Sequence, residues 1–284
     1  MKEIFSGVFR DGNRVYTANL NPGKSVYGEK LLDIVNPEKK HDMNSGFTDS
    51  SQGNNTRKNE VLSVQQESKI LARIHNVSLE NYKQTDVKQT DAEGVMQSGV
   101  TQSVMQLREW DPRRSKLGAA ISNGLKELPV QPGSIVLYLG ASTGTTISHV
   151  SDIVGKDGFV YGIEFAERVL RNLLDLANRR KNIASMLGDA RKTEQYRWVE
   201  ECDVVFCDIA DPQETEIAIR NCEFLKKGGY LMIAIKSQSI DVTKKPKDVY
   251  EQEKNKLEKA GFRIIQMIDL EPHEEKHAMI VAKK

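Results

Sequence analysis

The segment Ile135–Thr146 constrains the fold of this chain more than any other. An apolar run ends at Gly140, a second glycine follows at Gly144, and a helix-like pattern begins directly afterwards. The next apolar run, 159–163, leads into the acidic residue Glu164. The order strand, glycine turn, helix, strand and acid is typical of a nucleotide-type cofactor site at the carboxyl edge of a parallel sheet.

The spacing of the two glycines discriminates between cofactors. Dinucleotide sites carry G-x-G-x-x-G, which lets the backbone approach a pyrophosphate. Here Gly140 and Gly144 stand four positions apart, and no third glycine is in register. A cofactor without phosphates fits better, and S-adenosylmethionine (SAM) is the common one; NAD, or a turn without a ligand, are the alternatives. In a SAM site, Glu164 is expected to accept hydrogen bonds from the ribose hydroxyls.

The charge balance limits what the chain binds by itself. Its 284 residues hold 41 Lys and Arg against 40 Asp and Glu, whereas a self-sufficient nucleic-acid-binding domain is usually clearly basic. Cys202, Cys207 and Cys222 lack metal-site spacing and stand in apolar or helical surroundings, so we expect buried thiols in a reducing compartment. With no signal peptide and no apolar run of membrane-spanning length, the sequence predicts a soluble intracellular protein.

Composition divides the chain into three predicted parts. Residues 1–35 are expected to form a small β-rich domain, with a turn at 11–13 between two alternating runs. Residues 36–107 form a polar insertion that we expect to be mostly disordered, with one amphipathic helix near 60–79. That helix either caps the neighbouring domain or binds a partner. Residues 108–284 are predicted to form the main domain.

Apolar runs and helical patterns alternate regularly along the main domain. Strands are predicted at 135–139, 159–163, 183–187, 203–207, 230–236, 262–270 and 277–282, and helices at 115–128, 145–154, 167–178, 213–226 and 246–260. This alternation predicts an α/β fold with a parallel doubly wound sheet. The last two strands are joined by residues 271–276 alone, too few for a crossover, so this pair must be antiparallel. A parallel sheet with an antiparallel last hairpin is the Rossmann-like arrangement of SAM-dependent methyltransferases, which favours SAM over NAD.

Charged residues follow three of the predicted strands. Asp189, Asp208 and Lys236 each stand at or just after a carboxyl end, where open α/β sheets bind their ligands. An acid and a lysine at neighbouring strand ends are costly unless they are paired or used. The alternatives are an Asp208–Lys236 ion pair without chemistry, or a lysine that removes a proton from a weakly acidic hydroxyl. A free lysine titrates near ~10.4, so a base of this kind needs burial or nearby positive charge.

Several motifs together resemble the fibrillarin family in its archaeal form. The resemblance covers 109–284 nearly throughout, and also 1–34 with the run Val26–Lys30. The segments that carry it, in order and spacing, are Glu109–Leu117 (EWDPRRSKL), Gly140–Thr146, Gly162–Phe165, Gly188–Ala190, Asp208–Ala210, Ala234–Thr243 and Leu270–Met279.

The resemblance implies a SAM-dependent RNA 2′-O-ribose methyltransferase, the catalytic subunit of a C/D box guide ribonucleoprotein that acts on pre-rRNA and possibly tRNA. The implied catalytic set is Lys116, Asp208, Lys236 and His277, with Lys236 as the leading candidate base. The implied partners are a Nop-type scaffold protein, a kink-turn-binding ribosomal-type protein and a C/D box guide RNA. The implied cofactor contacts, together with Gly140 of the glycine turn, are Thr145, Thr146, Glu164, Phe165, Asp189, Ala190, Asp208, Ile209, Ala210 and Asp211.

The sequence departs from the family pattern in two places. Acids stand at Asp211 and Glu214, where the family often has glutamines, and the long insertion 36–107 replaces a short connection. No Gly/Arg-rich amino-terminal tail is present, which favours the archaeal type and a cytoplasmic rather than nucleolar location. A small-molecule methyltransferase, or an inactive structural subunit of the particle, are the competing hypotheses.

Overall fold

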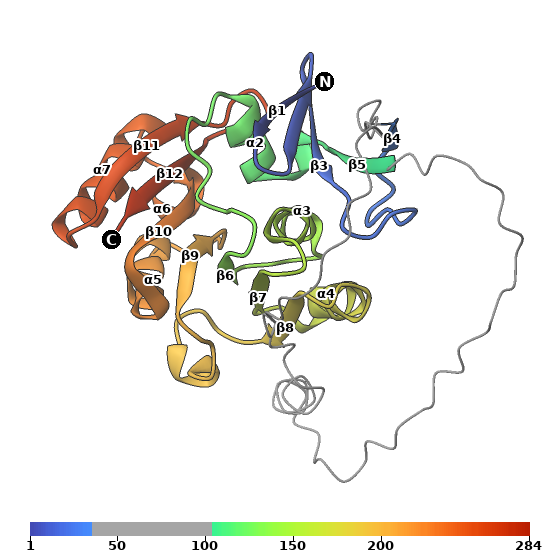
Figure 1. Cartoon of the computed structure of the whole chain (residues 1–284). Helices are drawn as coiled ribbons and strands as arrows, with labels where there is room; N and C mark the ends of the chain where they lie inside the picture. Colours follow the sequence, from blue (N-terminus) through green and yellow to red (C-terminus); the bar gives the residue numbers. More distant parts are fainter. Residues whose placement is uncertain (36–103) are drawn as a thin grey trace, which may run out of the picture. The chain divides into compact units, whose positions relative to one another are not determined.

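Seven strands form the main sheet in the order β11-β12-β10-β9-β6-β7-β8. The computed structural model describes residues 1–35 and 104–284, so the predicted disorder and the helix near 60–79 lie outside the described residues. The strands of this sheet are β6 (Ile135–Leu139), β7 (Phe159–Glu164), β8 (Ile183–Leu187), β9 (Cys202–Cys207), β10 (Leu225–Lys236), β11 (Arg263–Asp269) and β12 (His277–Lys283) (Figure 1).

The strand directions confirm the predicted fold class. β8, β7, β6, β9 and β10 pair in parallel. β12 runs antiparallel to both β10 and β11. β12 therefore inserts between β10 and β11 and places β11 at the edge of the sheet, an order that the short link between the last two strands did not reveal.

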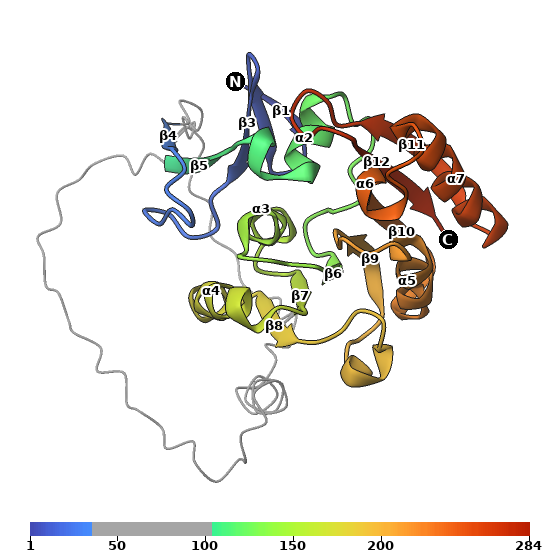
Figure 2. The same cartoon turned by 180° about the vertical axis from the view of Figure 1, so that it is seen from behind.

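Helices cover both faces of this sheet (Figures 1 and 2). α2 (Lys116–Ser122), α3 (Thr145–Val154) and α4 (Glu167–Arg179) lie on one face, and α5 (Glu214–Asn221) and α7 (Pro246–Lys259) on the other. A four-residue helix, α6 (Ser237–Ile240), follows β10 directly. Because both faces are covered, the central strands are apolar throughout, and Leu137, Phe206 and Ile233 are fully buried.

Two helices are shorter than predicted, each for a local reason. α2 ends at Ser122 rather than near 128, because Gly124 adopts a left-handed conformation with φ of 93°. α5 ends at Asn221 and gives way to a 3₁₀ turn at Cys222–Phe224, after which β10 begins at Leu225. The apolar pattern predicted only the second half of this strand.

A second sheet holds five strands in the order β1-β2-β3-β5-β4. They are β1 (Lys2–Phe5), β2 (Val8–Asp11), β3 (Arg14–Ala18), β4 (Leu31–Val35) and β5 (Val104–Trp110). The turn at 11–13 is confirmed by the pairing of β2 with β3. β5 crosses the predicted boundary at 107/108 and pairs with β3, so residues 1–35 do not complete this sheet by themselves. Val26 and Tyr27 lie in a loop rather than a strand.

A buried ion-pair network joins this sheet to α3. Arg108 on β5 is fully buried and contacts Asp152 of α3 at 2.6 Å and Glu29 at 2.6 Å. Arg180 contacts the other carboxylate oxygen of Asp152 at 2.7 Å. Nearby, the ring of Trp110 stacks on that of the buried residue His149, with centroids 4.6 Å apart. The network fixes the end of β5, from which the chain passes through a 3₁₀ helix at Pro112–Arg114 into α2.

No helix in the described ranges has the length and apolar character needed to cross a membrane.

Candidate functional site

A cavity of about 400 Å³ opens at the carboxyl ends of β6, β7, β8 and β9. Its lining contains most of the residues predicted to bind the cofactor: Gly140, Glu164, Phe165, Asp189, Ala190, Asp208, Ile209, Ala210 and Asp211. Thr145 and Thr146 are not among the lining residues. The structure thus gathers the predicted strand ends around one hollow.

The glycine turn lets two strand ends approach closely. Gly140 has φ of 78°, and a side chain there would collide with the backbone of Asp208. The amide of Asp208 in turn donates to the carbonyl of Leu139 at 2.9 Å. Gly144, with φ of 101°, faces Leu176 of α4 so closely that a β-carbon would lie 2.5 Å from that side chain. Both positions therefore require glycine for steric as well as conformational reasons.

The acid that ends β7 is held by the backbone. Glu164 is buried, and its two carboxylate oxygens accept hydrogen bonds from the amides of Ser142 at 2.7 Å and Ala166 at 2.8 Å. Each carboxylate oxygen can accept a second hydrogen bond. The side chain is thereby oriented in the cavity wall with acceptor capacity left for the hydroxyls of a ligand.

Thr146 serves the neighbouring helix. Its hydroxyl donates to Ser115 Oγ at 3.0 Å, and Ser115 Oγ accepts the amide of Gly118 at 3.1 Å as the N-cap of α2. This contact fixes the start of α2, which is where Lys116 stands. A cofactor contact for Thr145 and Thr146 stays a prediction.

Arg191 is a cavity residue that the sequence reasoning missed. Its guanidinium contacts Asp189 at 2.9 Å and lies 3.9 Å from Asp211. The same group lies over the ring of Phe165, 5.7 Å from its centroid. The hydrogen bond from Arg191 lowers the pKa of Asp189 below its usual range. Its position two residues after Asp189 was the available signal.

The first pair of predicted catalytic residues is formed by Lys116 and Asp208. Lys116 Nζ lies 2.9 Å from Asp208 Oδ1. Burial alone would lower the pKa of Lys116, but the neighbouring carboxylate outweighs it and holds that pKa above its ordinary value. The ion-pair partner of Asp208 is therefore Lys116 and not Lys236, and Lys116 carries its proton at neutral pH.

The second pair stands on adjacent strands. Lys236, the last residue of β10, lies directly opposite His277, the first residue of β12, so both side chains leave the same face of the sheet. Burial lowers the pKa of His277, and the charge of Lys116 acts in the same direction. His277 Nδ1 donates to the carbonyl of Glu275 at 2.7 Å. The imidazole is neutral and keeps Nε2 as an acceptor.

Glu214 contacts the backbone of Lys236. It was not predicted as a site residue. Only 1% of it is exposed. Its Oε1 accepts the backbone amide of Lys236 at 3.1 Å, while Oε2 has no partner among the described residues. Burial, with the nearby charges of Glu253 and Asp208, raises the pKa of Glu214 to about 9. Glu214 is therefore an uncharged acid at neutral pH.

The assembled chemistry suits proton removal from a hydroxyl beside a bound cofactor. Two lysines, an aspartate and a neutral histidine stand at one edge of the sheet, and Asp208 also lines the cavity. Within the described residues, no cluster of three or more His, Cys, Asp or Glu side chains could hold a metal ion. The three cysteines are buried and free, and burial raises the pKa of the thiols of Cys202 and Cys222 to about 12.

Comparison with known sequences identifies the family. A family model described as Fibrillarin matches residues 53–284. A curated relative from Sulfurisphaera tokodaii, named fibrillarin-like rRNA/tRNA 2′-O-methyltransferase, is 54% identical over 181 residues, which is 63% of this chain and 78% of the relative. A relative of the same name from Pyrococcus abyssi is 52% identical over 181 residues, covering 63% of this chain and 79% of the relative.

Solved structures agree with the sequences. The fibrillarin pre-rRNA processing protein of Methanococcus jannaschii has a TM-score of 0.71 at 36% identity, covering 99% of this chain and 96% of its own. The fibrillarin of Aeropyrum pernix, solved with natively bound SAM, has a TM-score of 0.65 at 36% identity, covering 95% and 88%. A fibrillarin/Nop5p complex gives a TM-score of 0.58 at 39% identity, covering 62% and 84%.

Proposed function

Because this chain belongs to the fibrillarin family, we propose that it is a SAM-dependent RNA 2′-O-ribose methyltransferase, the catalytic subunit of a C/D box guide ribonucleoprotein. The observation that carries the proposal is the Lys116–Asp208 pair at 2.9 Å, at the same sheet edge as Lys236 and His277 and bordering the cofactor cavity. Pre-rRNA is the expected substrate, with tRNA as a second.

The cavity fits SAM by the chemistry of its lining. A buried carboxylate at Glu164 offers acceptors for ribose hydroxyls, and Asp189, Ala190 and Phe165 supply a polar and apolar wall for a heterocycle. Asp208 and Asp211 add two carboxyl groups to the lining, which suits a cationic ligand. Bound SAM supplies an electrophilic methyl group on a positively charged sulfur. The relative from Aeropyrum pernix binds the same cofactor.

The catalytic roles follow from the positions of the four residues and from the protonation states of Lys116 and His277. Lys116 stays protonated beside Asp208, so it serves as a fixed positive charge rather than as the base. His277, neutral with a free Nε2, accepts a hydrogen bond and orients the ribose 2′-hydroxyl. Lys236 would accept the proton of the 2′-hydroxyl. Bound SAM would supply the methyl group, and its sulfur would keep the electrons of the broken S–CH₃ bond and leave as a neutral thioether. Holding both reactants in register contributes much of the rate.

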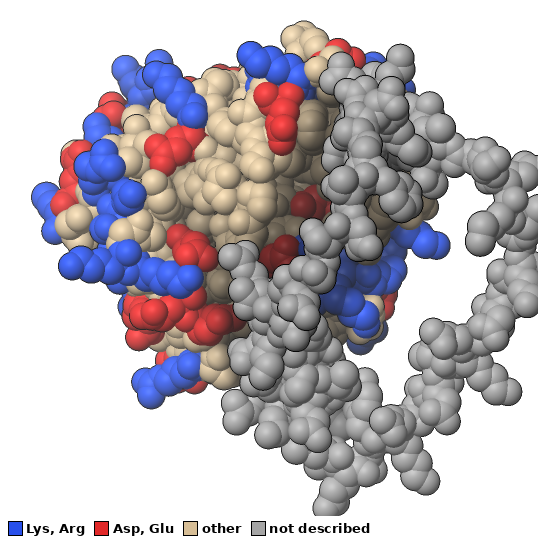
Figure 3. All heavy atoms as spheres, viewed as in Figure 1, with Lys and Arg blue, Asp and Glu red and all other residues tan. Residues whose placement is uncertain are grey.

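The surface charge supports dependence on partners. Basic and acidic residues are interspersed over α7 in the view of Figure 3, and the chain carries a formal net charge of +1. A protein whose charges nearly balance gains little affinity from RNA phosphates alone. We therefore assign RNA capture to a Nop-type scaffold, a kink-turn-binding protein and the guide RNA. The archaeal type of the relatives is the reason for proposing a cytoplasmic particle. The fibrillarin/Nop5p complex supports the scaffold assignment.

The test is methylation by particles assembled from this chain, a scaffold protein, the kink-turn-binding protein and a guide RNA. Lys236→Ala is expected to lower the single-turnover rate by roughly 10²–10⁴-fold, the usual loss for a removed base. Lys244→Ala, a change at an exposed lysine after α6, is the control. A near wild-type rate for Lys236→Ala contradicts the base assignment, and wild-type particles without 2′-O-methylation contradict the function.

A further inference from the structure

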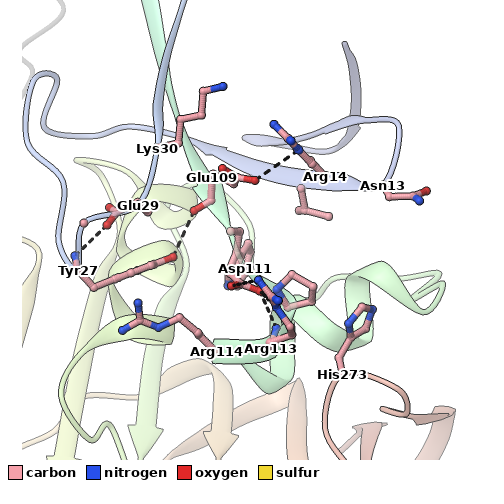
Figure 4. A pocket seen from close by; sticks show the side chains of 14 residues that line it. Asn13, Arg14, Tyr27, Glu29, Lys30, Glu109, Asp111, Arg113, Arg114 and His273 are labelled. Carbon is pink, nitrogen blue, oxygen red and sulfur yellow. Dashed lines mark hydrogen bonds and ion pairs between the residues drawn. The ribbon is translucent and has the colours of Figure 1, made fainter.

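A second cavity, of about 450 Å³, lies between the five-stranded sheet and the segment that leads into α2. We call it the basic groove. The basic residues in its lining are Arg14, Lys30, Arg113, Arg114 and His273 (Figure 4). The cofactor cavity shares none of these residues. The groove is therefore separate from the cofactor cavity.

The acids of the groove are already committed. The Glu29 side chain is only 3% exposed and pairs with a buried arginine behind the groove at 2.6 Å. Asp111 pairs with Arg113 at 3.0 Å and also caps the short helix that follows it. Glu109 lies 3.7 Å from Arg14, a loose contact between partly exposed groups. Of the remaining basic side chains, Arg114 acts on Asp111 through its charge alone, which helps to lower the pKa of that carboxyl.

Arg114 is presented in a form that suits an anion. Its guanidinium lies over the ring of Tyr27, 4.6 Å from the centroid, and Figure 4 shows the two side chains next to each other in the lining. Stacking uses the face of a guanidinium and leaves the N–H donors at its edge free for a bidentate contact with phosphate. Among residues 1–35 and 104–284, neither Arg114 nor Lys30 has a carboxylate within 4 Å.

The groove adjoins the catalytic residues along the chain on two sides. Arg114 stands two positions before Lys116, so their Cα atoms are at most about 7 Å apart. His273 stands four positions before His277, in the link between β11 and β12. The groove therefore borders the catalytic residues along the chain, where the nucleotides next to a ribose held at those residues would pass.

We propose that the basic groove binds the sugar-phosphate backbone of the target RNA strand, next to the methylated nucleotide, with Arg114 contacting one phosphate. The inference rests on the proposed function and adds a positioning site to it. Guide pairing supplies most of the affinity for the target. The groove therefore contributes when the catalytic subunit docks on the paired target strand. Its contribution appears in the rate at saturating target rather than in target affinity.

The decisive experiment combines a protein change with a change in the RNA. Arg114→Ala particles are expected to lose about tenfold in single-turnover rate at saturating target, the effect of one charge-assisted hydrogen bond, while SAM affinity stays within twofold. A neutral methylphosphonate is then placed at each phosphate near the target nucleotide. At one position it should cause the same loss in wild-type particles and no further loss in Arg114→Ala particles, because both changes remove one contact.

Matched variants separate charge from geometry. Arg114→Lys keeps the positive charge but loses the planar guanidinium that can donate two hydrogen bonds to one phosphate, so it should recover only part of the rate. Arg171→Ala, an exposed arginine on α4 outside the groove, should change nothing. The rate of Arg114→Ala should also depend less steeply on salt, by about one unit of the logarithmic slope.

Three results overturn the proposal. They are an unchanged rate for Arg114→Ala, additive effects at every methylphosphonate position, and failure of the variant to co-purify with the scaffold protein. The last result would mark the groove as a protein interface. Absence of 2′-O-methylation by wild-type particles contradicts the proposed function instead, so the two failures are distinguishable.

Discussion

Replacing Glu214 by glutamine is expected to stabilise the protein at neutral pH. The carboxyl is 1% exposed and its pKa is raised to about 9, against 4.5 for the free group. The groups that face it are Glu253 of α7, Asp208 after β9, Lys116 of α2 and the backbone amide of Lys236. The two negative neighbours and burial favour the protonated form over the charged one.

The sign of the pH dependence follows from proton binding. Between pH 4.5 and 9 the folded protein keeps the proton of Glu214, whereas the unfolded chain releases it. Stability therefore falls as pH rises through this window. The interval from pH 4.5 to pH 7 corresponds to a loss of about 3 kcal/mol. Glutamine has the same shape and cannot ionise in either state, so Glu214→Gln avoids that loss while keeping an acceptor for the Lys236 amide.

Thermal and urea unfolding between pH 5 and pH 8.5 measure this directly. Glu214→Gln should match the wild type near pH 5 and exceed it by about 3 kcal/mol at pH 7, or roughly 6–12 °C in Tm for a domain of this size. Glu216→Gln on the same helix is the matched control, since Glu216 is largely exposed and pairs with Lys256 at 2.9 Å; it should show no growing gain. A Glu214→Gln protein that is less stable at pH 7, or a difference that does not vary with pH, refutes the reasoning.

Further changes test the cofactor cavity, the buried network and the insertion. Gly140→Ala should weaken SAM binding at least tenfold by calorimetry, because φ of 78° and the close Asp208 backbone leave no room for a side chain; unchanged affinity would show that the turn adapts. Asp152→Ala should cost about 3–5 kcal/mol in urea unfolding, since it leaves the buried Arg180 without a carboxylate and removes one of the two carboxylates that pair with Arg108; a loss under 1 kcal/mol would contradict this. Replacing residues 36–103 by a short Gly/Ser linker should preserve folding and SAM binding, because β4 and β5 are neighbours in the sheet and closure entropy grows slowly with length; an unfolded product would show that the insertion is required.

The site residues that could be predicted from the sequence are those whose positions follow from a pattern within one segment. Asp189, Asp208 and Lys236 could be placed because each ends an apolar run, and parallel strands bring their carboxyl ends to one edge. The start of α3 at Thr145 follows from the glycine turn before it. The roles of Lys116 and His277 came from resemblance alone, since neither stands in a pattern with an intrinsic chemical meaning.

Residues brought together from distant segments escaped the sequence reasoning. For Arg191, the sequence offered only its position two residues after Asp189. For Glu214, it offered only the acid at a position where the family often has glutamine. An uncharged glutamate resembles glutamine in shape, which explains how that departure fits beside Lys236. Whether an acid is charged depends on what surrounds it in three dimensions.

The sequence by itself determined the order of strands and helices, the parallel core with its antiparallel last hairpin, and the edge where the ligand binds. These features depend on local periodicity and on connection lengths, both of which are visible in short stretches of the sequence. Only the tertiary structure decided that β12 inserts between β10 and β11, that β5 completes the sheet of the amino-terminal residues, and that Asp208 pairs with Lys116. Those choices depend on strand pairing and charge burial between residues far apart in sequence, where many arrangements share the same local pattern and packing selects one.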